Sequence, residues 1–182
     1  MTLNQLLSEV YALGFEDEGE LDESFVFSVR RALKMIFTEL APAVRGKIVI
    51  NEDSAKELDL RKHFDDVMII TSAPTDKSGQ IIRGAFSDGY SITLPDTFTG
   101  EAYIRYKPKP QAIDVDHADD EITIPAFAEH LLPLLTASFV FLDDDAEKAD
   151  YYMTLYRHEA LKLTRATADS INNTYTDVTG WA

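Results

Sequence analysis

The strongest structural signal in the chain is residues 125–163, PAFAEHLLPLLTASFVFLDDDAEKADYYMTLYRHEALKL. The first half is apolar on nearly every side of a helix that Pro125 is suited to begin, so this helix must be buried. An acidic turn over residues 143–145 favours the start of a second helix, and Arg157 and Lys162 favour its end. The stretch therefore predicts a helical hairpin. The buried stripe expected on its second helix is Ala149, Tyr152, Met153, Tyr156, Ala160 and Leu163.

Two amphipathic helices are predicted upstream, at the N-terminal end of the chain. Thr2 and Gln5 form a capping-box pattern, and leucine and valine then recur at helical spacing, which predicts a first helix over residues 3–13. An acidic connector over residues 16–23 precedes a second helix, which must stop before Pro42. The stripe predicted for the second helix is Val26, Val29, Leu33, Ile36 and Leu40.

Between these helical ends, residues 47–107 change to short strand-like runs divided by Pro, Gly, Asp and Ser. A turn at Ser87-Asp88-Gly89 predicts a hairpin between two of these runs. The last run alternates, with Ala102, Ile104 and Tyr106 on one face and Tyr103, Arg105 and Lys107 on the other. The predicted strands cover residues 47–50, 67–71, 80–86, 90–94 and 101–107.

The order of elements predicts an α+β fold, in which an antiparallel helical bundle is formed by N-terminal helices (residues 1–45) and a C-terminal helical hairpin (residues 111–170). An antiparallel β-rich subdomain (residues 46–110) is inserted between them. An extended tail (residues 171–182) follows, rich in Asn and Thr and without a helical period. Trp181 in this tail is the only tryptophan, and an indole is a common interface anchor. It either docks on another subunit or folds back on its own chain.

Net charge limits the partners that the chain can bind. The formal charge of −15 opposes tight binding to nucleic acid, although a uniformly negative wall lets DNA slide past without gripping it. Tyr103, Tyr106 and Arg105 are candidates for stacking bases on a sheet, but the surrounding negative charge favours a role in covering a half-buried strand.

The composition also limits the chemistry. Without cysteine, the chain has no disulfide, thiol nucleophile or zinc–thiolate site. No apolar run is long enough to cross a bilayer and the start lacks the pattern of a secretory signal, so we expect a soluble protein.

No catalytic, cofactor or metal site is predicted. The acidic stretch 114–121, which contains His117, lacks the order of an EF-hand loop, and a solvated loop is expected. The aspartates at 143–145 are placed to cap a helix. Phosphate-cradling glycine loops and the Ser nucleophile elbow are missing from the sequence.

Residues 124–163 resemble the C-terminal helical hairpin of head-to-tail connector adaptors of tailed bacteriophages. In that family an apolar helix and a short acidic turn precede a Glu-Lys-Ala triplet, paired tyrosines and a Tyr-x-x-x-x-Leu pattern. The start of the chain, TLNQLL at residues 2–7, and the acidic border of the second helix also look like the family. The matching residues here are Glu147, Lys148, Ala149, Tyr151, Tyr152, Tyr156 and Leu161.

This resemblance implies a non-enzymatic virion protein of the neck, assembled in the host cytoplasm. Its partners would be the portal protein, further neck or tail proteins, and other copies in a ring, usually of twelve, through which double-stranded DNA passes. No cofactor or membrane is implied. The expected portal-docking tail contains Ile171, Tyr175, Val178 and Trp181, and the expected packing between subunits uses Phe127, Leu131, Leu135, Phe139, Tyr152 and Tyr156.

Two alternatives remain open from the sequence. A small soluble binding module would use the β-rich insert to hold a protein or sugar partner. A metal-dependent hydrolase would use Asp116 and Asp119 of the acidic stretch as metal ligands.

Overall fold

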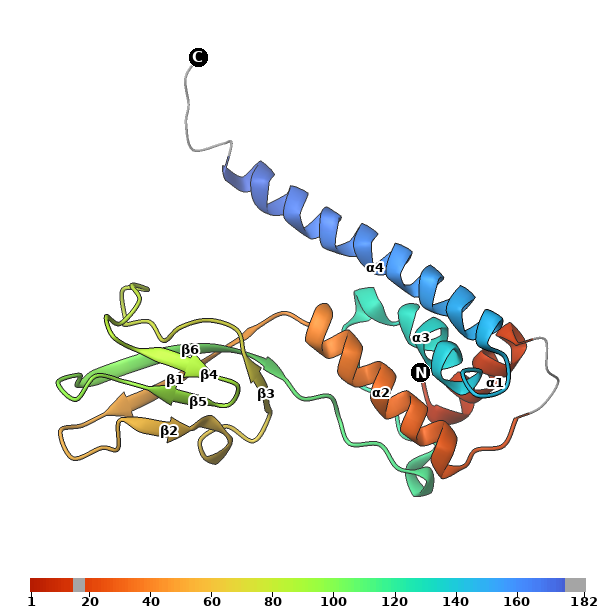
Figure 1. The fold of residues 1–182 in the computed structure, drawn as a ribbon, viewed down its shortest axis with the longest axis horizontal. Coiled ribbons are helices and arrows are strands. Elements are labelled where there is room, and N and C mark those ends of the chain that lie inside the picture. The colour runs from red at the N-terminus through yellow and green to blue at the C-terminus, as the bar shows by residue number, and fades with distance from the viewer. Residues whose placement is uncertain (15–18, 176–182) are drawn as a thin grey trace, which may run out of the picture. The chain divides into compact units, whose positions relative to one another are not determined.

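The computed structural model describes residues 1–14 and 19–175, and the side chains of the last helix as far as Thr164. It is an α+β chain of four helices and two small antiparallel sheets (Figure 1). The helices are α1 (Leu3–Leu13), α2 (Glu23–Glu39), α3 (Leu131–Val140) and α4 (Ala146–Tyr175). The strands are β1 (Val44–Ile50), β2 (Glu57–Asp59), β3 (Val67–Ile70), β4 (Phe86–Asp88), β5 (Ser91–Thr93) and β6 (Gly100–Pro108).

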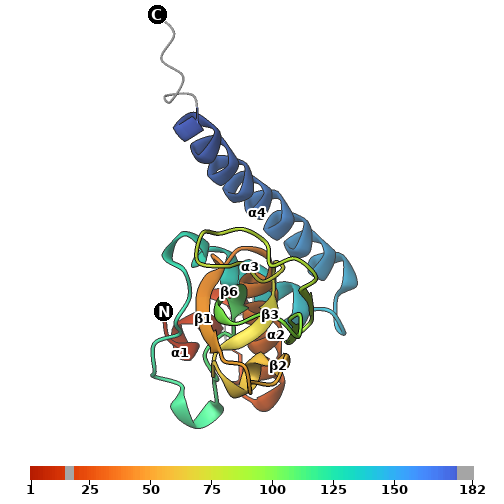
Figure 2. The same ribbon diagram turned by 90° about the vertical axis from the view of Figure 1, so that its left-hand side faces the viewer.

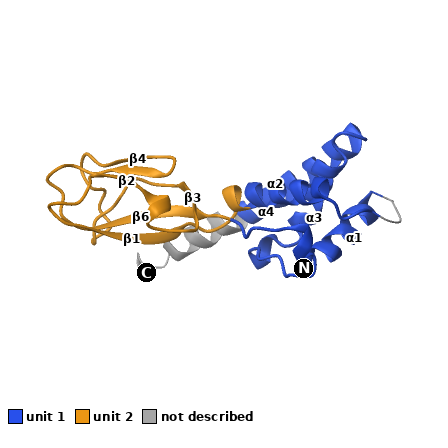
Figure 3. Ribbon diagram, turned by 90° about the horizontal axis from the view of Figure 1, so that it is seen from below, with its two compact units in different colours: residues 1–36, 110–182 blue, residues 37–109 orange. Residues whose placement is uncertain are grey.

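The chain divides into two compact units (Figure 3). The helical unit contains Met1–Ile36 and Pro110–Ala182, and the β unit contains Phe37–Lys109. The predicted boundaries were residues 46 and 110, so the β unit begins earlier than the strand pattern indicates, at the last turns of α2.

The first helix has the predicted bounds, and the second has the predicted buried face except at Leu40, which lies after the end of the helix and is half-buried. In the capping box of α1, Thr2 Oγ1 accepts from the Gln5 amide at 3.3 Å and Gln5 Oε1 accepts from the Thr2 amide at 2.8 Å. Asp22 accepts from the Phe25 amide at 2.7 Å and so caps α2, which ends before Pro42 as predicted. The apolar side chains buried on α1 and α2 include Leu3, Leu6, Val10, Val26, Val29, Leu33 and Ile36.

The third helix is shorter than predicted. Instead of starting at Pro125, it starts at Leu131, after a separate short 3₁₀ turn at Ala126–Ala128. The reason is Pro133, whose ring and missing N–H are tolerated only in the first turn of a helix. A start at Leu131 places Pro133 in that turn.

The last helix begins as predicted and is longer than predicted. Asp145 accepts from the Lys148 amide at 3.0 Å, which confirms a capping role for the acidic turn. Residues 171–175, predicted as extended, are helical, because they contain neither Pro nor Gly and each residue added to a helix gains a hydrogen bond. The predicted stripe is confirmed at Ala149, Tyr152, Tyr156 and Ala160, while Met153 and Leu163 are half-buried.

The β unit consists of sheets ordered β1-β6-β3 and β2-β5-β4, and the three strands of the first lie side by side in Figure 2. Its core is built from both sheets. The predicted faces of β6 are confirmed: Ala102, Ile104 and Tyr106 are buried and Arg105 is exposed. The buried core residues are Ile48, Ile50, Leu60, Val67, Ile82, Ile92, Leu94, Ala102, Ile104 and Tyr106.

Two strand predictions were wrong in detail. Residues 80–85 form no strand, and only Ile81 makes a single bridge, to Thr75. The predicted hairpin exists, but Asp88 pairs with Ser91, so the turn is Gly89-Tyr90 rather than residues 87–89. Gly89 has φ of +57°, which a residue without a side chain adopts at little cost and which fixes the turn at this position.

Candidate assembly surfaces

The acidic stretch is used for local structure. Asp114 accepts from the Asp116 amide at 3.4 Å, Asp119 accepts from Asn4 Nδ2 at 2.9 Å, and Glu121 lies 3.9 Å from the N-terminal ammonium. Within the described residues, no group of three or more His, Asp or Glu side chains is arranged to hold a metal ion. Asp116 and Asp119 therefore do not converge with a third ligand there.

The clearest pKa shifts also have local causes. The hydrogen bonds from Arg61 lower the pKa of Asp59 to about 2. Burial, with a hydrogen bond to Asp66 at 2.9 Å, raises the pKa of Tyr106 to about 12. Asp59 and Tyr106 interact with different partners in the β unit, so neither shift brings an acid and a base together.

A groove with a mostly polar surface and an acidic rim lies in the helical unit. This α2–α3 groove, of about 260 Å³, is lined by the start of α2, the end of α3 and the turn that follows α3. Phe27 and Leu142 are its most exposed apolar side chains, at 58% and 49%. The carboxylates in its lining are those of Asp22, Asp143 and Asp144.

Phe139 and Arg31 form one wall of this groove. The Arg31 guanidinium lies 4.2 Å from the centre of the Phe139 ring, within the range of a cation–π contact. Phe139 is half-buried and Arg31 is exposed, so the stacked pair holds an aromatic surface in a fixed position beside Phe27. The groove thus combines a few exposed apolar side chains with a largely polar and charged lining, which are features that an amphipathic helix can contact.

Helix α4 is much longer than the helix it packs against. Its 30 residues span about 45 Å, whereas the 10 residues of α3 span about 15 Å, and α4 extends past α3 in Figure 1. Ala160 is the last buried residue of α4 in its described part. One residue later, Leu161 is 56% exposed. Two basic residues are near it in sequence: Arg157 four residues before it and Lys162 directly after it.

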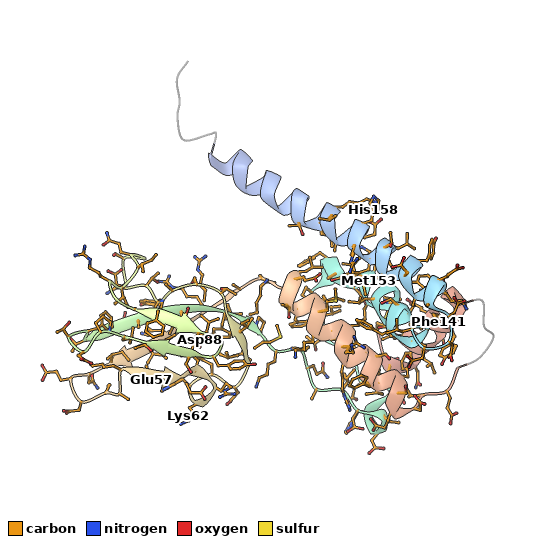
Figure 4. The ribbon with its side chains drawn as sticks, in the orientation of Figure 1. Glu57, Lys62, Asp88, Phe141, Met153 and His158 are labelled. Atoms are coloured by element: carbon orange, nitrogen blue, oxygen red, sulfur yellow. The ribbon has the colours of Figure 1, made fainter. Side chains whose placement is uncertain are left out.

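Phe141 connects the start of α4 to α1 by aromatic contacts. Its ring lies 6.2 Å from that of Tyr152 and 6.3 Å from that of Tyr11, and its position is labelled in Figure 4. The Tyr152 hydroxyl donates to the Leu13 carbonyl. The start of α4 is therefore fixed to α1 and to the hairpin turn, while Leu161, Lys162 and Thr164 beyond Ala160 are exposed.

The side chains predicted to pack between subunits divide into two groups. Leu131, Leu135, Tyr152 and Tyr156 are buried inside their own chain, because α3 and α4 pack directly on each other. They have almost no surface left to offer a second copy in this conformation. Phe127, at 47% exposed, and the half-buried Phe139 retain such surface.

Only part of the predicted docking tail lies within the described residues. Ile171 and Tyr175 belong to α4, and Val178 and Trp181 lie outside the described residues. The sequence patterns did not identify Phe27, Leu142 and Leu161 as surface residues. Phe27 and Leu161 fall off the buried stripes of their helices, and a large apolar residue at such a position is the signal that identifies them.

No family model matches this chain, and no curated protein matches it in sequence. None of the helices in the described part of the chain is both long and apolar enough to cross a membrane. The helical unit therefore has two candidate surfaces, the α2–α3 groove and the part of α4 around Leu161, which we call the distal part of α4. Both have to be interpreted from their own geometry.

Proposed function

We propose that this chain is a non-enzymatic structural subunit, an adaptor of a bacteriophage head-to-tail connector that assembles as a ring between the portal and the tail. The proposal includes a finer architecture, a helical bundle that carries the β unit as an inserted subdomain. It draws on the resemblance of residues 124–163 and on one geometric observation. The same unit presents a groove that contains the exposed apolar side chains Phe27 and Leu142, and a long helix with an exposed leucine, Leu161.

Two different surfaces of this kind suit a ring. A contact in which one surface of a subunit meets another surface of the next is heterologous, and such contacts close into rings when the rotation permits. In the proposed contact, the distal part of α4 enters the α2–α3 groove of the neighbouring copy. Leu161 would meet Phe27 and Leu142, which are apolar side chains that solvent otherwise covers.

Charge also supports this contact. The groove has carboxylates at Asp22, Asp143 and Asp144, and the α4 segment around Leu161 carries Arg157 and Lys162. Opposite charges at the edge of an apolar contact fix its register and speed the encounter more than they add affinity. Lys162 is paired with Glu159 at 2.7 Å, so Arg157 is the more available cation.

A ring of such subunits would carry a strongly negative helical part. The helical unit has 21 acidic and 7 basic residues, a net charge of −14. A negative lumen repels phosphates and lets double-stranded DNA pass without adhering. The proposed partners are the portal, further neck or tail proteins and, in the family's usual number, eleven further copies, with Ile171, Tyr175, Val178 and Trp181 directed to the portal.

The experiment that tests this proposal uses complementary variants. Phe27→Asp disables the groove and Leu161→Asp disables the helix, and Val49→Asp is the matched control at an exposed apolar residue of the β unit. Each protein is mixed with the portal and sized by light scattering and native mass spectrometry. We expect rings from the wild type and V49D, but not from F27D or L161D.

Mixing F27D with L161D sharpens the test. Each pair retains one intact groove and one intact helix, so a heterologous contact predicts a heterodimer that cannot grow into a ring. Rings from both single variants would contradict the proposed contact. Failure of the wild type to bind an intact portal would contradict the connector function itself.

A second function, a small binding module that uses the β unit, is favoured by a specific observation. Arginines stack on exposed aromatic rings in that unit, with Arg61 4.6 Å from the Tyr90 ring and Arg45 4.0 Å from the Tyr103 ring. Such planar surfaces suit sugars or peptides. A monodisperse monomer that ignores the portal and binds such a ligand would favour this function.

A further inference from the structure

Two arginines lie directly opposite each other on the outer face of the β unit. The antiparallel register of β1 and β6 pairs Arg45 with Arg105, and both are exposed. Like charges at directly opposed positions of a sheet destabilise the pairing. Among the residues that the structure describes, neither guanidinium has an ion-pair partner. An anion bound between the two guanidinium groups would neutralise this repulsion.

Both arginines line a pocket. This pocket, of about 270 Å³, is lined by both guanidinium groups, Tyr103 and the segment that contains Ser72, Thr75 and Gly79. The Arg45 guanidinium lies 4.0 Å from the Tyr103 ring centre, which orients it. Thr75 is held to the same strand because its amide donates to the Tyr103 carbonyl at 2.8 Å.

The other charged groups around this pocket leave it positive. Glu101 is the nearest carboxylate on the strand, and it accepts hydrogen bonds from Lys47 at 3.0 Å and from the Tyr103 hydroxyl at 2.6 Å. Glu101 lies four residues before Arg105 on β6, and its charge is matched by that of Lys47. The Asp76 carboxylate accepts from Ser78 and from the Gln80 amide within its own turn.

This positive face belongs to a unit that is nearly neutral. The β unit has 11 acidic and 10 basic residues, so its net charge is −1, and the net charge of −15 lies almost entirely in the helical unit. The argument that acidity opposes nucleic-acid binding therefore applies to the helical unit. It does not apply to the outer face of β1 and β6.

We propose that Arg45 and Arg105 together hold a phosphate group in this pocket, the phosphodiester backbone of DNA being the source that a connector encounters. The choice of DNA rests on the proposed function, whereas the phosphate site rests on the arginine pair. A guanidinium fork matches phosphate oxygens in geometry, and a phosphate between two such forks converts their repulsion into attraction. Ser72 in the pocket lining carries a further hydroxyl donor, whereas the Thr75 hydroxyl donates to the Tyr103 carbonyl at 3.4 Å.

The test measures binding of a short fluorescent duplex to the full chain by anisotropy over a series of salt concentrations. Because the arginine pair neutralises one phosphate, the plot of log affinity against log salt should have a slope of about −0.9. Arg105→Gln and Arg45→Gln should each weaken binding and move that slope towards zero. Arg83→Gln, an equal loss of charge at an exposed arginine of the same unit outside the pocket, should leave the slope unchanged.

Inorganic phosphate distinguishes the sources of the ligand. A ligand that binds only the folded state raises the melting temperature. If phosphate stabilises the wild type but not R45Q or R105Q and the duplex does not bind, the site takes free phosphate and the DNA assignment is wrong. A polyglutamate peptide that binds in place of both phosphate and duplex would overturn the proposal in favour of an acidic protein partner.

Equal behaviour of wild type, R45Q and R105Q towards both phosphate and duplex would also overturn it. Ring assembly with the portal, measured by mass on the same variants, separates this result from failure of the proposed function. We expect R45Q and R105Q to assemble as the wild type does, because both arginines lie outside the α2–α3 groove and α4.

Discussion

The helical unit and the β unit contain similar numbers of basic residues, 7 and 10, but the helical unit has 21 acidic residues against 11 in the β unit. Both units expose apolar side chains, but those of the helical unit at Phe27 and Leu142 lie in a groove with carboxylates, whereas the β unit also presents an exposed arginine pair. The comparison teaches that the net charge of a whole chain does not describe either surface. The two units are suited to different partners, a neighbouring protein for the first and an anion for the second.

The largest expected effect is a loss of stability in the helical unit alone. Tyr156 is fully buried on α4, and Tyr156→Ala should lower the free energy of unfolding by about 3–5 kcal/mol, because the removed ring leaves a cavity. Tyr151→Ala, at an exposed tyrosine of the same helix, is the control and should cost far less. Amide hydrogen exchange with Y156A should show lost protection in the helical unit and retained protection in β1 and β6. Equal loss in both units would contradict their separate cores.

The stability of the β unit, by contrast, should depend on pH. The pKa of Tyr106 is raised from 10.0 to about 12, so the folded state keeps a proton that the unfolded chain loses. The resulting stability is fully present below pH 10 and is lost as the pH rises from about 10 to about 12, by no more than about 2–3 kcal/mol.

The measurement is urea unfolding at several alkaline pH values. Tyr106→Phe should flatten the pH dependence of the β unit across this window, whereas Tyr90→Phe, at an exposed tyrosine of the same unit, should leave it as in the wild type. A slope unchanged by Y106F would show that another group causes the alkaline loss.

A smaller effect concerns the first helix of the helical unit. Thr2→Ala removes the capping oxygen of α1 and should lower the free energy of unfolding by about 1 kcal/mol. Thr2→Ser keeps the oxygen and should cost much less. Denaturation monitored by circular dichroism measures both variants, and equal losses for T2A and T2S would contradict the capping role.

The smallest expected effect has the opposite sign. In phosphate-free buffer, Arg105→Gln should raise the free energy of unfolding by about 0.2–1 kcal/mol, because it removes a like-charged pair across β1 and β6. Arg83→Gln controls for the general loss of positive charge. Urea unfolding compares the two variants, and a lower stability of R105Q than of R83Q would argue against repulsion between the arginines.

Sequence patterns were most informative where burial within the chain produces a period. The bounds of α1, the stripe of α2 and the two faces of β6 follow directly from such periods. The start of α3 was missed because one residue, Pro133, overrides a long apolar run. The short strand β2 was missed because three residues are too few to show an alternation.

The candidate surfaces were less predictable for a related reason. Phe27, Leu142 and Leu161 are exposed, and exposed apolar residues obey no period. The pairing of Arg45 with Arg105 depends on the register of two strands far apart in the sequence, which no local pattern specifies. A division of charge between units can be counted only when the boundaries of the units are known.

The most direct test of the connector function is electron cryomicroscopy of the full chain mixed with its candidate portal. The proposal predicts a ring on the portal. In this ring the part of α4 around Leu161 of each subunit lies in the α2–α3 groove of the next subunit, and residues 171–182 are directed to the portal. A chain that remains monomeric and unbound beside intact portal rings would contradict it.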